Sequence, residues 1–365
     1  MLNKRPPQNE IKDRLYTILL DLESQLQAQK VPELHIKTRS KTNIFLKEKG
    51  YWELGDEKKT RKTLKTKGGA KELLKLVHMI SYIIEQMEAG KTSTIRECYY
   101  CALNWIDEAR FEKVNDSNTC LENIEIILNC VREDFGMYPN EEGKISGPIE
   151  LEYQTRGNGK KKVNCVNDVG TSGFLLPRSL SEINVLSTSA KFVLVVETAG
   201  LHSRLMEERF DELHHCIILC SGGMPSRVSR MFLKMLNTDY KLPIAIFTDG
   251  DAAGVRIASS IMNGAVKSSH LSKFLCVPSA IHIGLYPSQI EEHNLPTDSI
   301  TKLEKENLHL MLNDPGGKFD IWRDHMTEML RTGKKAEQQA FCYHGIEYVS
   351  KVFLPNVLRE NNFPI

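Results

Sequence analysis

The chain has 365 residues, of which 41% are hydrophobic and 26% are charged, and its formal net charge is +1. This length suggests two or three domains, and this composition excludes a globally disordered protein. A nearly neutral chain also cannot bind nucleic acid through a general basic excess, so any such surface must come from a local cluster of charges.

The nine cysteines are odd in number and irregularly spaced, which favours free thiols in a reducing, intracellular protein. Cys98 and Cys101 form a single C-x-x-C, and without a second pair we expect no zinc site. The polar N-terminus has no apolar signal core, and no apolar run approaches membrane-spanning length. We therefore expect a soluble protein with no membrane partner.

The first predicted element is an amphipathic helix over residues 10–30. Its apolar residues recur every three or four positions, at Ile11, Leu15, Ile18, Leu22 and Leu26. Such a helix either packs on its own core or docks on a partner, and the sequence leaves both open. Residues 34–54 are predicted to be extended.

A basic segment follows, beginning at Lys58 and ending at Lys75. It holds eight Lys or Arg residues and a single acid, Glu72. A solvated surface is one interpretation of such a run, and contact with DNA or with a partner protein is the other.

Three helices are predicted next, at residues 71–87, 94–107 and 119–131. The first has strong apolar periodicity, and the other two begin with a capping box, in which a Thr is followed three residues later by a Glu. Alternating segments between turn residues at 135–165 predict a hairpin. Three helices followed by a hairpin are typical of a winged-helix, CAP-like DNA-binding domain.

From about residue 185, strand-like runs at 192–196, 216–220, 244–247 and 281–285 alternate with helical stretches. This alternation is typical of an α/β domain with a mainly parallel sheet. We therefore interpret the chain as an α/β multidomain protein. Its predicted parts are an N-terminal helix and extended basic segment at 1–70, a winged-helix domain at 71–148, and an α/β domain with C-terminal helices at 149–365.

Three acids follow strands of this predicted sheet. Glu197 ends the first strand, and Asp249 and Asp251 follow the third. Ligands bind at the carboxyl ends of parallel strands, so these carboxylates could converge on one point. Clustered carboxylates repel one another unless a cation neutralises them, and Mg²⁺ is the usual hard ion in phosphate chemistry. The pattern predicts a magnesium site in preference to scattered surface acids.

A second candidate lies on the helix predicted from residue 94. Arg96 and Tyr100 are four residues apart and share one face of that helix. A tyrosine with the usual pKa of about 10 needs a nearby cation or base to act as a nucleophile, and Arg96 could serve as that cation. Taken alone, the adjacent Tyr99 and Tyr100 are more typical of an amphipathic core.

Nucleotide-binding motifs are not present. Gly90-Lys91-Thr92 resembles the end of a P-loop, but position 85 is Glu where the first glycine belongs. Ser221-Gly222-Gly223 does not match a dinucleotide fingerprint either. We expect no nucleotide cofactor in this chain.

Taken together, these motifs resemble those of the A-subunit family of type IIB topoisomerases (topoisomerase VI), which also includes the meiotic double-strand-break transesterase. The matching stretches keep the family's order from about residue 35 to Leu354. They are residues 91–100, 195–201, 221–227, 248–254, 283–288, 294–296 and 335–341.

This resemblance implies a winged-helix domain that carries the tyrosine, followed by a Toprim domain that carries the acids. On the family's pattern, Tyr100 would be the nucleophile and Arg96 its basic companion. Glu197, Asp249 and Asp251 would hold Mg²⁺, and Glu197 would also transfer a proton. The implied reaction is a reversible transesterification through a 5′-phosphotyrosyl link.

The resemblance also implies partners. These are double-stranded DNA, a second copy of the chain whose metal site meets the tyrosine of the first, and a GHKL-type B subunit that binds ATP, in an A2B2 heterotetramer. We predict that the N-terminal amphipathic helix docks on the B subunit. The expected location is the cytoplasm, with the nucleoid, in a prokaryote and the nucleus in a eukaryote.

Two departures from the family's pattern occur beside the acids. Thr198 stands where Lys is common, and Ala252-Ala253 replaces a proline and a bulky aromatic residue. Two other functions stay open within the same family, a meiotic-type break-forming protein and a catalytically silent DNA-binding homologue. A haloacid-dehalogenase-like phosphatase is a weaker alternative, because its D-x-D motif would follow the first strand of the domain.

Overall fold

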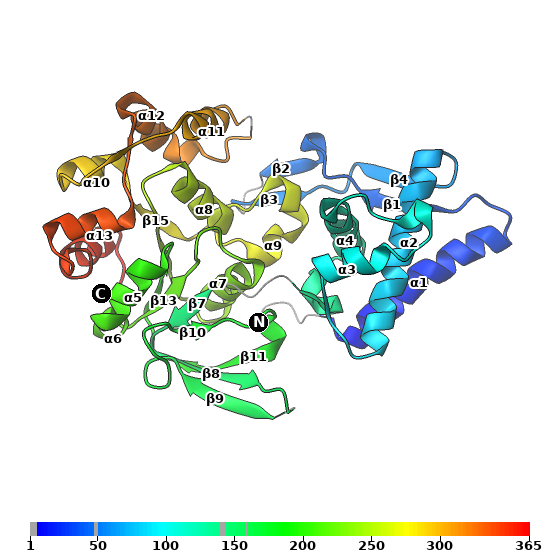
Figure 1. Ribbon diagram of the computed structural model, residues 1–365, viewed down its shortest axis with the longest axis horizontal. Coiled ribbons are helices and arrows are strands. Elements are labelled where there is room, and N and C mark those ends of the chain that lie inside the picture. Colours follow the sequence, from blue (N-terminus) through cyan, green and yellow to red (C-terminus); the bar gives the residue numbers. More distant parts are fainter. Residues whose placement is uncertain (1–5, 47–49, 139–142, 158, 315) are drawn as a thin grey trace. The chain divides into compact units, whose positions relative to one another are not determined.

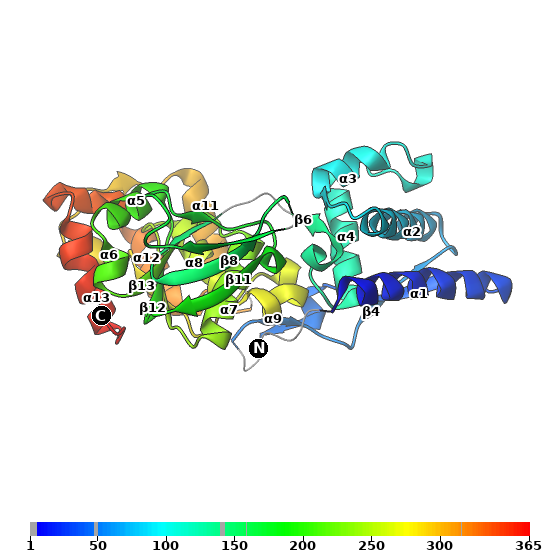
Figure 2. The same ribbon diagram turned by 90° about the horizontal axis from the view of Figure 1, so that it is seen from below.

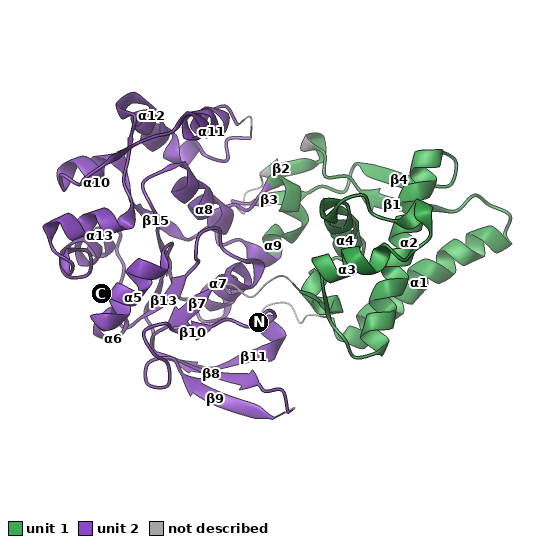
Figure 3. Ribbon diagram, in the orientation of Figure 1, with its two compact units in different colours: residues 1–45, 52–140, 266–273 green, residues 46–51, 141–265, 274–365 purple. Residues whose placement is uncertain are grey.

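The computed structural model describes residues 6–46, 50–138, 143–157, 159–314 and 316–365 (Figure 1). The chain forms two compact units, which we describe separately (Figure 3). Unit 1 comprises residues 1–45, 52–140 and 266–273, and unit 2 comprises residues 46–51, 141–265 and 274–365. Parts of the predicted 1–70 segment and of the predicted 135–165 hairpin lie outside the described residues. Within the described ranges, no helix is long and apolar enough to cross a membrane.

Unit 1 consists of helices and short strand pairs. Its helices are α1 (Gln8–Gln27), α2 (Lys67–Glu88), α3 (Ile95–Ala102) and α4 (Val114–Leu128). Its strands are β1 (Glu33–Lys37), β2 (Ile44–Leu46), β3 (Trp52–Leu54), β4 (Lys59–Thr63), β5 (Ser93–Thr94) and β6 (Met137–Tyr138). The pairs are β1 with β4, β2 with β3, and β5 with β6.

One hydrophobic core joins these elements. Ile11 and Leu15 of α1 and Ile36 of β1 lie in the same buried cluster as Met79 of α2 and Leu121 of α4. The N-terminal helix and the β1–β4 ribbon therefore belong to the same compact unit as the three helices, whereas the sequence suggested a separate segment at 1–70.

The prediction for the second helix is correct at its start and wrong at its end. The Thr94 hydroxyl accepts from the Glu97 amide at 3.2 Å, and the Glu97 carboxylate accepts from the Thr94 amide at 2.7 Å. The helix ends at Ala102 and not near residue 107. The indole of Trp105 instead packs against His78 of α2, with ring centroids 5.4 Å apart, and this packing turns the chain away from the helix axis.

The third helix begins earlier than predicted, at Val114. Its start is stabilised by the Asp116 carboxylate, which accepts from the Lys113 amide at 3.1 Å. Thr119 lies inside the helix and donates to the Asn115 carbonyl at 3.0 Å. The Thr119–Glu122 spacing is therefore not a capping box.

Unit 2 is built on a six-stranded sheet with the order β10-β7-β13-β12-β14-β15. Its strands are β7 (Lys144–Ser146), β10 (Phe174–Leu175), β12 (Phe192–Val196), β13 (Cys216–Cys220), β14 (Ile244–Phe247) and β15 (Ile281–Gly284). The last four are parallel to one another, whereas β7 pairs antiparallel with β13, and β10 pairs antiparallel with β7. The predicted mainly parallel sheet is therefore confirmed. Every residue of β12, β13 and β14 is buried, as expected for parallel strands covered on both faces, whereas Ile281 of the edge strand β15 is exposed.

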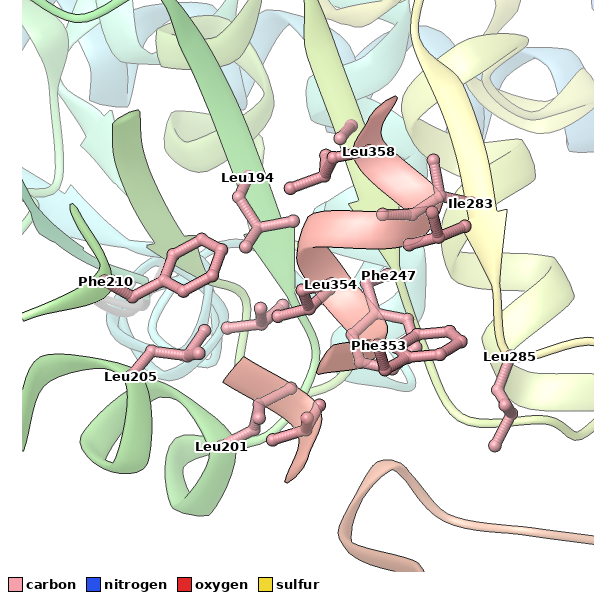
Figure 4. Close-up of a cluster of buried hydrophobic side chains, with 14 of the residues drawn as sticks. Leu194, Leu201, Leu205, Phe210, Phe247, Ile283, Leu285, Phe353, Leu354 and Leu358 are labelled. Atoms are coloured by element: carbon pink, nitrogen blue, oxygen red, sulfur yellow. The ribbon is translucent and has the colours of Figure 1, made fainter. Parts of the chain in front are cut away.

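Unit 2 also contains a set of helices. They are α5 (Ala199–Glu207), α6 (Phe210–Leu213), α7 (Arg227–Asp239), α8 (Ala252–Met262), α9 (Ser272–Leu275), α10 (Pro287–Glu292), α11 (Lys302–Leu312), α12 (Arg323–Thr332) and α13 (Leu354–Glu360), with the short β16 (Asp298–Ser299) and β17 (Lys334–Lys335) between them. Residues 272 and 273 of α9 are assigned to unit 1. Figure 4 shows Leu194 of β12 and Phe247 of β14 pointing toward Leu354 and Leu358 of α13, with Phe210 of α6 beside them. The C-terminal helix therefore completes one face of the sheet's core.

The hairpin predicted within 135–165 is present as β8 (Ile149–Gln154) and β9 (Lys160–Asn164), but it lies in unit 2. There β8 also pairs with β11 (Ile183–Thr188), which gives a three-stranded sheet (Figures 1 and 2). This hairpin therefore does not extend the three helices of unit 1 as a wing. A winged-helix form for unit 1 stays a prediction.

A buried ion pair stabilises unit 1. Arg132 donates from Nε and Nη2 to the two carboxylate oxygens of Glu125 at 3.1 Å each, with both side chains almost fully buried. Removing one partner of such a pair leaves a buried charge uncompensated, which costs about 3–5 kcal/mol, whereas replacing both partners by apolar residues is often nearly neutral.

We therefore expect Glu125→Ala to lower the free energy of unfolding by about 3–5 kcal/mol, and the double variant Glu125→Leu/Arg132→Met to lower it less. Urea denaturation followed by circular dichroism measures both. A single variant as stable as the parent protein, or a double variant less stable than the single one, would contradict this account.

Candidate active site

Two of the predicted acids meet at the centre of the unit 2 sheet. From β12, the chain continues to β13 on one side, and β14 then pairs with the other side of β12. Open α/β sheets bind ligands at such a reversal of strand order, beyond the carboxyl ends of the strands. Glu197 directly follows β12, and Asp249 lies two residues beyond β14. The Asp249 amide donates to Glu197 Oε2 at 3.1 Å, so the fold brings these two residues together.

Asp251 lies at the start of α8, where its Oδ1 accepts from the Gly254 amide at 2.8 Å. This bond caps the helix. A Cβ atom at position 254 would lie 2.1 Å from the Asp249 carbonyl oxygen, so only glycine allows the tight turn between the two aspartates. The sequence Asp-Gly-Asp-Ala-Ala-Gly thus fixes the backbone that presents both acids.

The negative charges of the acids repel one another. Burial, together with the negative charge of Asp249, raises the pKa of Glu197 to about 7. Burial raises the pKa of Asp249 to about 6, with Asp251 and Glu337 adding to the effect. Near neutral pH, these groups therefore resist carrying their full negative charge, and a cation or a proton relieves the conflict.

The turn that carries Asp249 and Asp251 is held by a C-terminal segment, residues 336–339. Sequence reasoning did not place this segment at the site. The Gln338 amide donates to Asp249 Oδ1 at 2.8 Å, and the Gln338 side chain donates to the Phe247 carbonyl at 2.8 Å. The Gly250 amide donates to the Ala336 carbonyl at 2.8 Å. Gln338 is completely buried. The only sequence signal was the matching stretch at residues 335–341, to which no role was assigned.

The departure at Thr198 has a structural role. Its hydroxyl accepts from the Leu201 amide at 3.4 Å, which caps α5, and from Gln339 Nε2 at 3.0 Å. Thr198 therefore connects the residue after Glu197 to the same C-terminal segment that holds Asp249.

A series of hydrogen bonds between buried side chains leads to the residue that precedes Asp249. Trp322 Nε1 donates to His282 Nδ1 at 2.8 Å, and His282 Nε2 lies 2.9 Å from Thr248 Oγ1. Because Nδ1 accepts, the proton of the neutral ring is on Nε2 and is donated to Thr248. Burial lowers the pKa of His282 to about 3, which keeps the ring neutral. Thr248 directly precedes Asp249, so these hydrogen bonds fix the turn's backbone.

The donor set suits a hard cation in its chemistry. Glu197, Asp249 and Asp251 offer only carboxylate oxygens, the ligands that Mg²⁺ prefers. Within the described part of the chain, no three His, Cys, Asp or Glu side chains converge to enclose a metal ion. One oxygen of each acid accepts from a backbone amide. Mg²⁺ commonly takes one or two carboxylates and completes its shell with water and phosphate oxygens, so full enclosure by the protein is not required.

The tyrosine candidate lies in unit 1. The α3 helix buries Cys98 and Ala102 against the core, whereas Tyr100 is 65% exposed and Arg96, one turn earlier, is also exposed. Tyr99 is partly buried against the core and meets the Tyr100 ring edge-on, with centroids 5.4 Å apart. The expectation that both tyrosines are core residues is therefore wrong for Tyr100.

Comparison with known proteins places these features in a family. Residues 71–137 match the family described as "Type IIB DNA topoisomerase", and residues 140–189 match "All-beta domain in DNA topoisomerase VI alpha subunit". Residues 192–358 match the Toprim domain shared by Spo11 and the topoisomerase 6 A subunits.

Curated relatives match over nearly the whole chain. A protein of Natronomonas pharaonis, named as the A subunit of type 2 DNA topoisomerase 6, is 40% identical over 96% of this chain and 95% of its own length. Proteins with the same name are 38% identical in Haloarcula marismortui, over 97% of each chain, and in Archaeoglobus fulgidus, over 95% of this chain and 96% of the relative.

The raised pKa of Glu197 predicts how stability depends on pH in metal-free buffer. The folded protein keeps a proton on Glu197 up to about pH 7, whereas the unfolded chain loses it near pH 4. The contribution of Glu197 to stability therefore falls as pH rises through this window and does not change further above it. Between pH 5 and pH 8, we expect the free energy of unfolding of Glu197→Gln to decrease by about 1–3 kcal/mol less than that of the parent protein.

Urea denaturation in the presence of EDTA at several pH values measures this effect. Glu306→Gln, on the exposed face of α11, is the matched control and should follow the parent protein. Parallel curves for Glu197→Gln and the parent would show that Glu197 has an ordinary pKa.

Proposed function

The chain belongs to the family of type IIB DNA topoisomerase A subunits, and we propose that it cuts duplex DNA by transesterification, with Tyr100 as the nucleophile. The observation that carries this proposal is the exposed phenol of Tyr100 on a capped helix whose other face is anchored in the core. The partly buried acid pair of unit 2, Glu197 and Asp249, would supply the second half of the chemistry.

In the proposed reaction, the phenol of Tyr100 gives its proton to solvent and its Oη attacks a backbone phosphorus, the bond from phosphorus to the 3′ oxygen breaks, and a 5′-phosphotyrosyl ester forms. One phosphoester replaces another, so the reverse attack by the 3′ hydroxyl reseals the strand without an outside energy source. Arg96 lies one turn from Tyr100 on the exposed side of α3. Its guanidinium would stabilise the phenolate and hold the phosphate.

Glu197 is our candidate for the proton-transfer group. A general acid works best when its pKa lies near the working pH, and the pKa of Glu197 is raised to about 7. Protonated Glu197 would donate to the leaving 3′ oxygen and take the proton back on resealing. The backbone bonds to Asp249 and Gln338 would keep the carboxyl groups fixed during the exchange.

Glu197, Asp249 and Asp251 would hold Mg²⁺. When bound, the ion would supply positive charge near the scissile phosphate. The ion would also offset the repulsion that Asp251 and Glu337 exert on Asp249.

We further propose the assembly that this chemistry needs. Double-stranded DNA is the substrate, and each strand is cut by Tyr100 of one copy of the chain together with the acids of a second copy. ATP hydrolysis would come from a GHKL-type B subunit in an A2B2 complex. The α1 helix buries Ile11 and Leu15 in its own core but leaves Leu20 and Leu26 more than half exposed, at 59% and 57%. That outer side is our candidate contact for the B subunit.

The proposal predicts a clear difference between the two adjacent tyrosines. Tyr100→Phe removes the attacking oxygen and should reduce DNA cleavage by about a thousandfold or more. Tyr99→Phe, the matched control, keeps the ring that packs on the core and should cleave DNA normally. The assay uses the complex with a cognate B subunit, supercoiled plasmid, Mg²⁺ and ATP, quenched with detergent and protease. Equal cleavage by Tyr100→Phe and the parent would refute the proposed nucleophile.

A second prediction concerns the metal. At about ten times its dissociation constant, a ligand that binds only the folded state stabilises it by about 1.4 kcal/mol. Mg²⁺ should therefore raise the melting temperature of the parent protein and of Glu306→Gln, but not that of Asp249→Asn. Thermal unfolding with and without Mg²⁺ measures this, independently of cleavage. An equal shift in Asp249→Asn would exclude Asp249 as a ligand.

A further inference from the structure

The basic segment that begins at Lys58 folds into a ribbon with an unusual arrangement of charge. The strands β1 and β4 lie side by side as an antiparallel pair (Figure 1). In the register of this pair, Lys37 lies directly opposite Lys59, and His35 lies opposite Arg61. Residues directly opposite in such a pair point to the same face. His35, Lys59 and Arg61 are exposed and Lys37 is partly so. One face of the ribbon therefore carries two cross-strand pairs of basic residues.

Packing does not require these basic residues. The other face of the ribbon carries Leu34 and Ile36, and Ile36 is buried in the core of unit 1. Like charges directly opposite each other destabilise a strand pair. The fold would therefore be at least as stable with neutral side chains on the outer face.

Neighbouring acids compensate only part of this charge. Glu33 lies 3.4 Å from Arg61 and also 3.3 Å from His35, and Asp56 pairs with Lys37. These groups are largely solvent-exposed, where an ion pair contributes little. Within the described part of the chain, Lys59 makes no ion pair.

Exposed basic residues continue along the chain past the ribbon. Lys65 lies in the turn before α2, and Lys67 and Lys71 lie in the first turns of that helix. None of the three makes an ion pair among the described residues. Glu72, the one acid of the segment, pairs with Lys62. The N-terminal end of a helix adds partial positive charge. We define the cationic ribbon surface as Lys37, Lys59, Arg61, Lys65, Lys67 and Lys71.

We propose that this cationic ribbon surface binds the phosphate backbone of duplex DNA, away from the phosphate that is cut. The inference rests on the proposed function, since it takes DNA as the substrate. Successive outward residues on a strand are about 6.8 Å apart, so Lys59 and Arg61 present a row of charge that follows a polyanion. Contacts from Lys and Arg to phosphate oxygens carry no sequence information, because every base pair presents the same phosphates. The surface therefore binds DNA of any sequence, and bound phosphates relieve the repulsion across the ribbon.

The test compares two variants, each of which replaces three basic residues with Gln. The first is Lys59→Gln/Arg61→Gln/Lys71→Gln, within the cationic ribbon surface. The control is Lys302→Gln/Lys305→Gln/Arg359→Gln, three exposed basic residues of α11 and α13 in unit 2. Both carry the same change in net charge, so a general electrostatic effect would appear equally in both.

Binding of each protein to a fluorescent duplex is measured by anisotropy over a range of salt concentrations, without Mg²⁺ so that no cleavage occurs. Each lost phosphate contact reduces the slope of log K against log salt by about 0.9. We call the first variant, within the cationic ribbon surface, the ribbon variant. We expect the magnitude of its slope to be smaller by about 2–3 than that of the parent protein. We also expect its affinity at low salt to be at least tenfold lower, equally for unrelated duplex sequences. The control should keep the parent slope.

Thermal unfolding provides a second readout. The ribbon variant should melt at the same temperature as the parent or higher, because repulsion between the strands is removed. A lower melting temperature would show that the charges serve the fold and would overturn the proposal.

The outcomes separate this inference from the proposed function. If the parent binds DNA but the ribbon variant keeps its slope, the ribbon surface is not a DNA contact, while Tyr100 chemistry stands. If the ribbon variant binds DNA normally but no longer binds a B subunit, the surface docks an acidic partner and the inference is wrong. If the parent protein binds no DNA, the proposed function itself fails.

Discussion

The structure of unit 2 depends on placing two partly buried carboxylates side by side. Glu197 and Asp249 follow adjacent parallel strands, and burial with nearby negative charge raises the pKa of both. Neighbouring backbone amides supply hydrogen-bond donors to these carboxylates. The Asp249 amide and the Gln338 amide each donate to a carboxylate. The order of the strands, the glycine at position 254 and the clamp by the C-terminal segment all serve to hold this unfavourable pair in place.

The sequence predicted this centre well because its signals are local. The strands β12, β13 and β14 are continuous apolar runs, and the carboxyl ends of β12 and β14 locate the acids. The clamp was not predictable in the same way. Gln338 is 89 positions from Asp249, and a buried glutamine with a bond to a backbone carbonyl leaves no periodic pattern. Tertiary contacts of this kind become visible only in the folded chain.

The errors in unit 1 have a related cause. The end of α3 was misplaced because Trp105 packs against α2, a contact that helix signals near residue 94 cannot show. The hairpin at 149–164 was correctly predicted as a hairpin and wrongly joined to the helices, because its partner β11 lies 19 residues beyond it in the chain. Local patterns give the elements, whereas the neighbours of an element depend on which apolar faces remain to be covered.

The acid pair and the cationic ribbon surface each hold like charges close together, negative in the first and positive in the second. A chain with a net charge of only +1 concentrates negative charge at Glu197, Asp249 and Asp251 and positive charge at the β1–β4 ribbon. Each cluster is unfavourable by itself, since like charges are held together by the fold. In the proposed function, each is relieved by a different part of the reaction complex, the acids by Mg²⁺ and the ribbon by DNA phosphates. Local charge conflict would then provide affinity for the ligand, because binding removes a repulsion that the free protein retains.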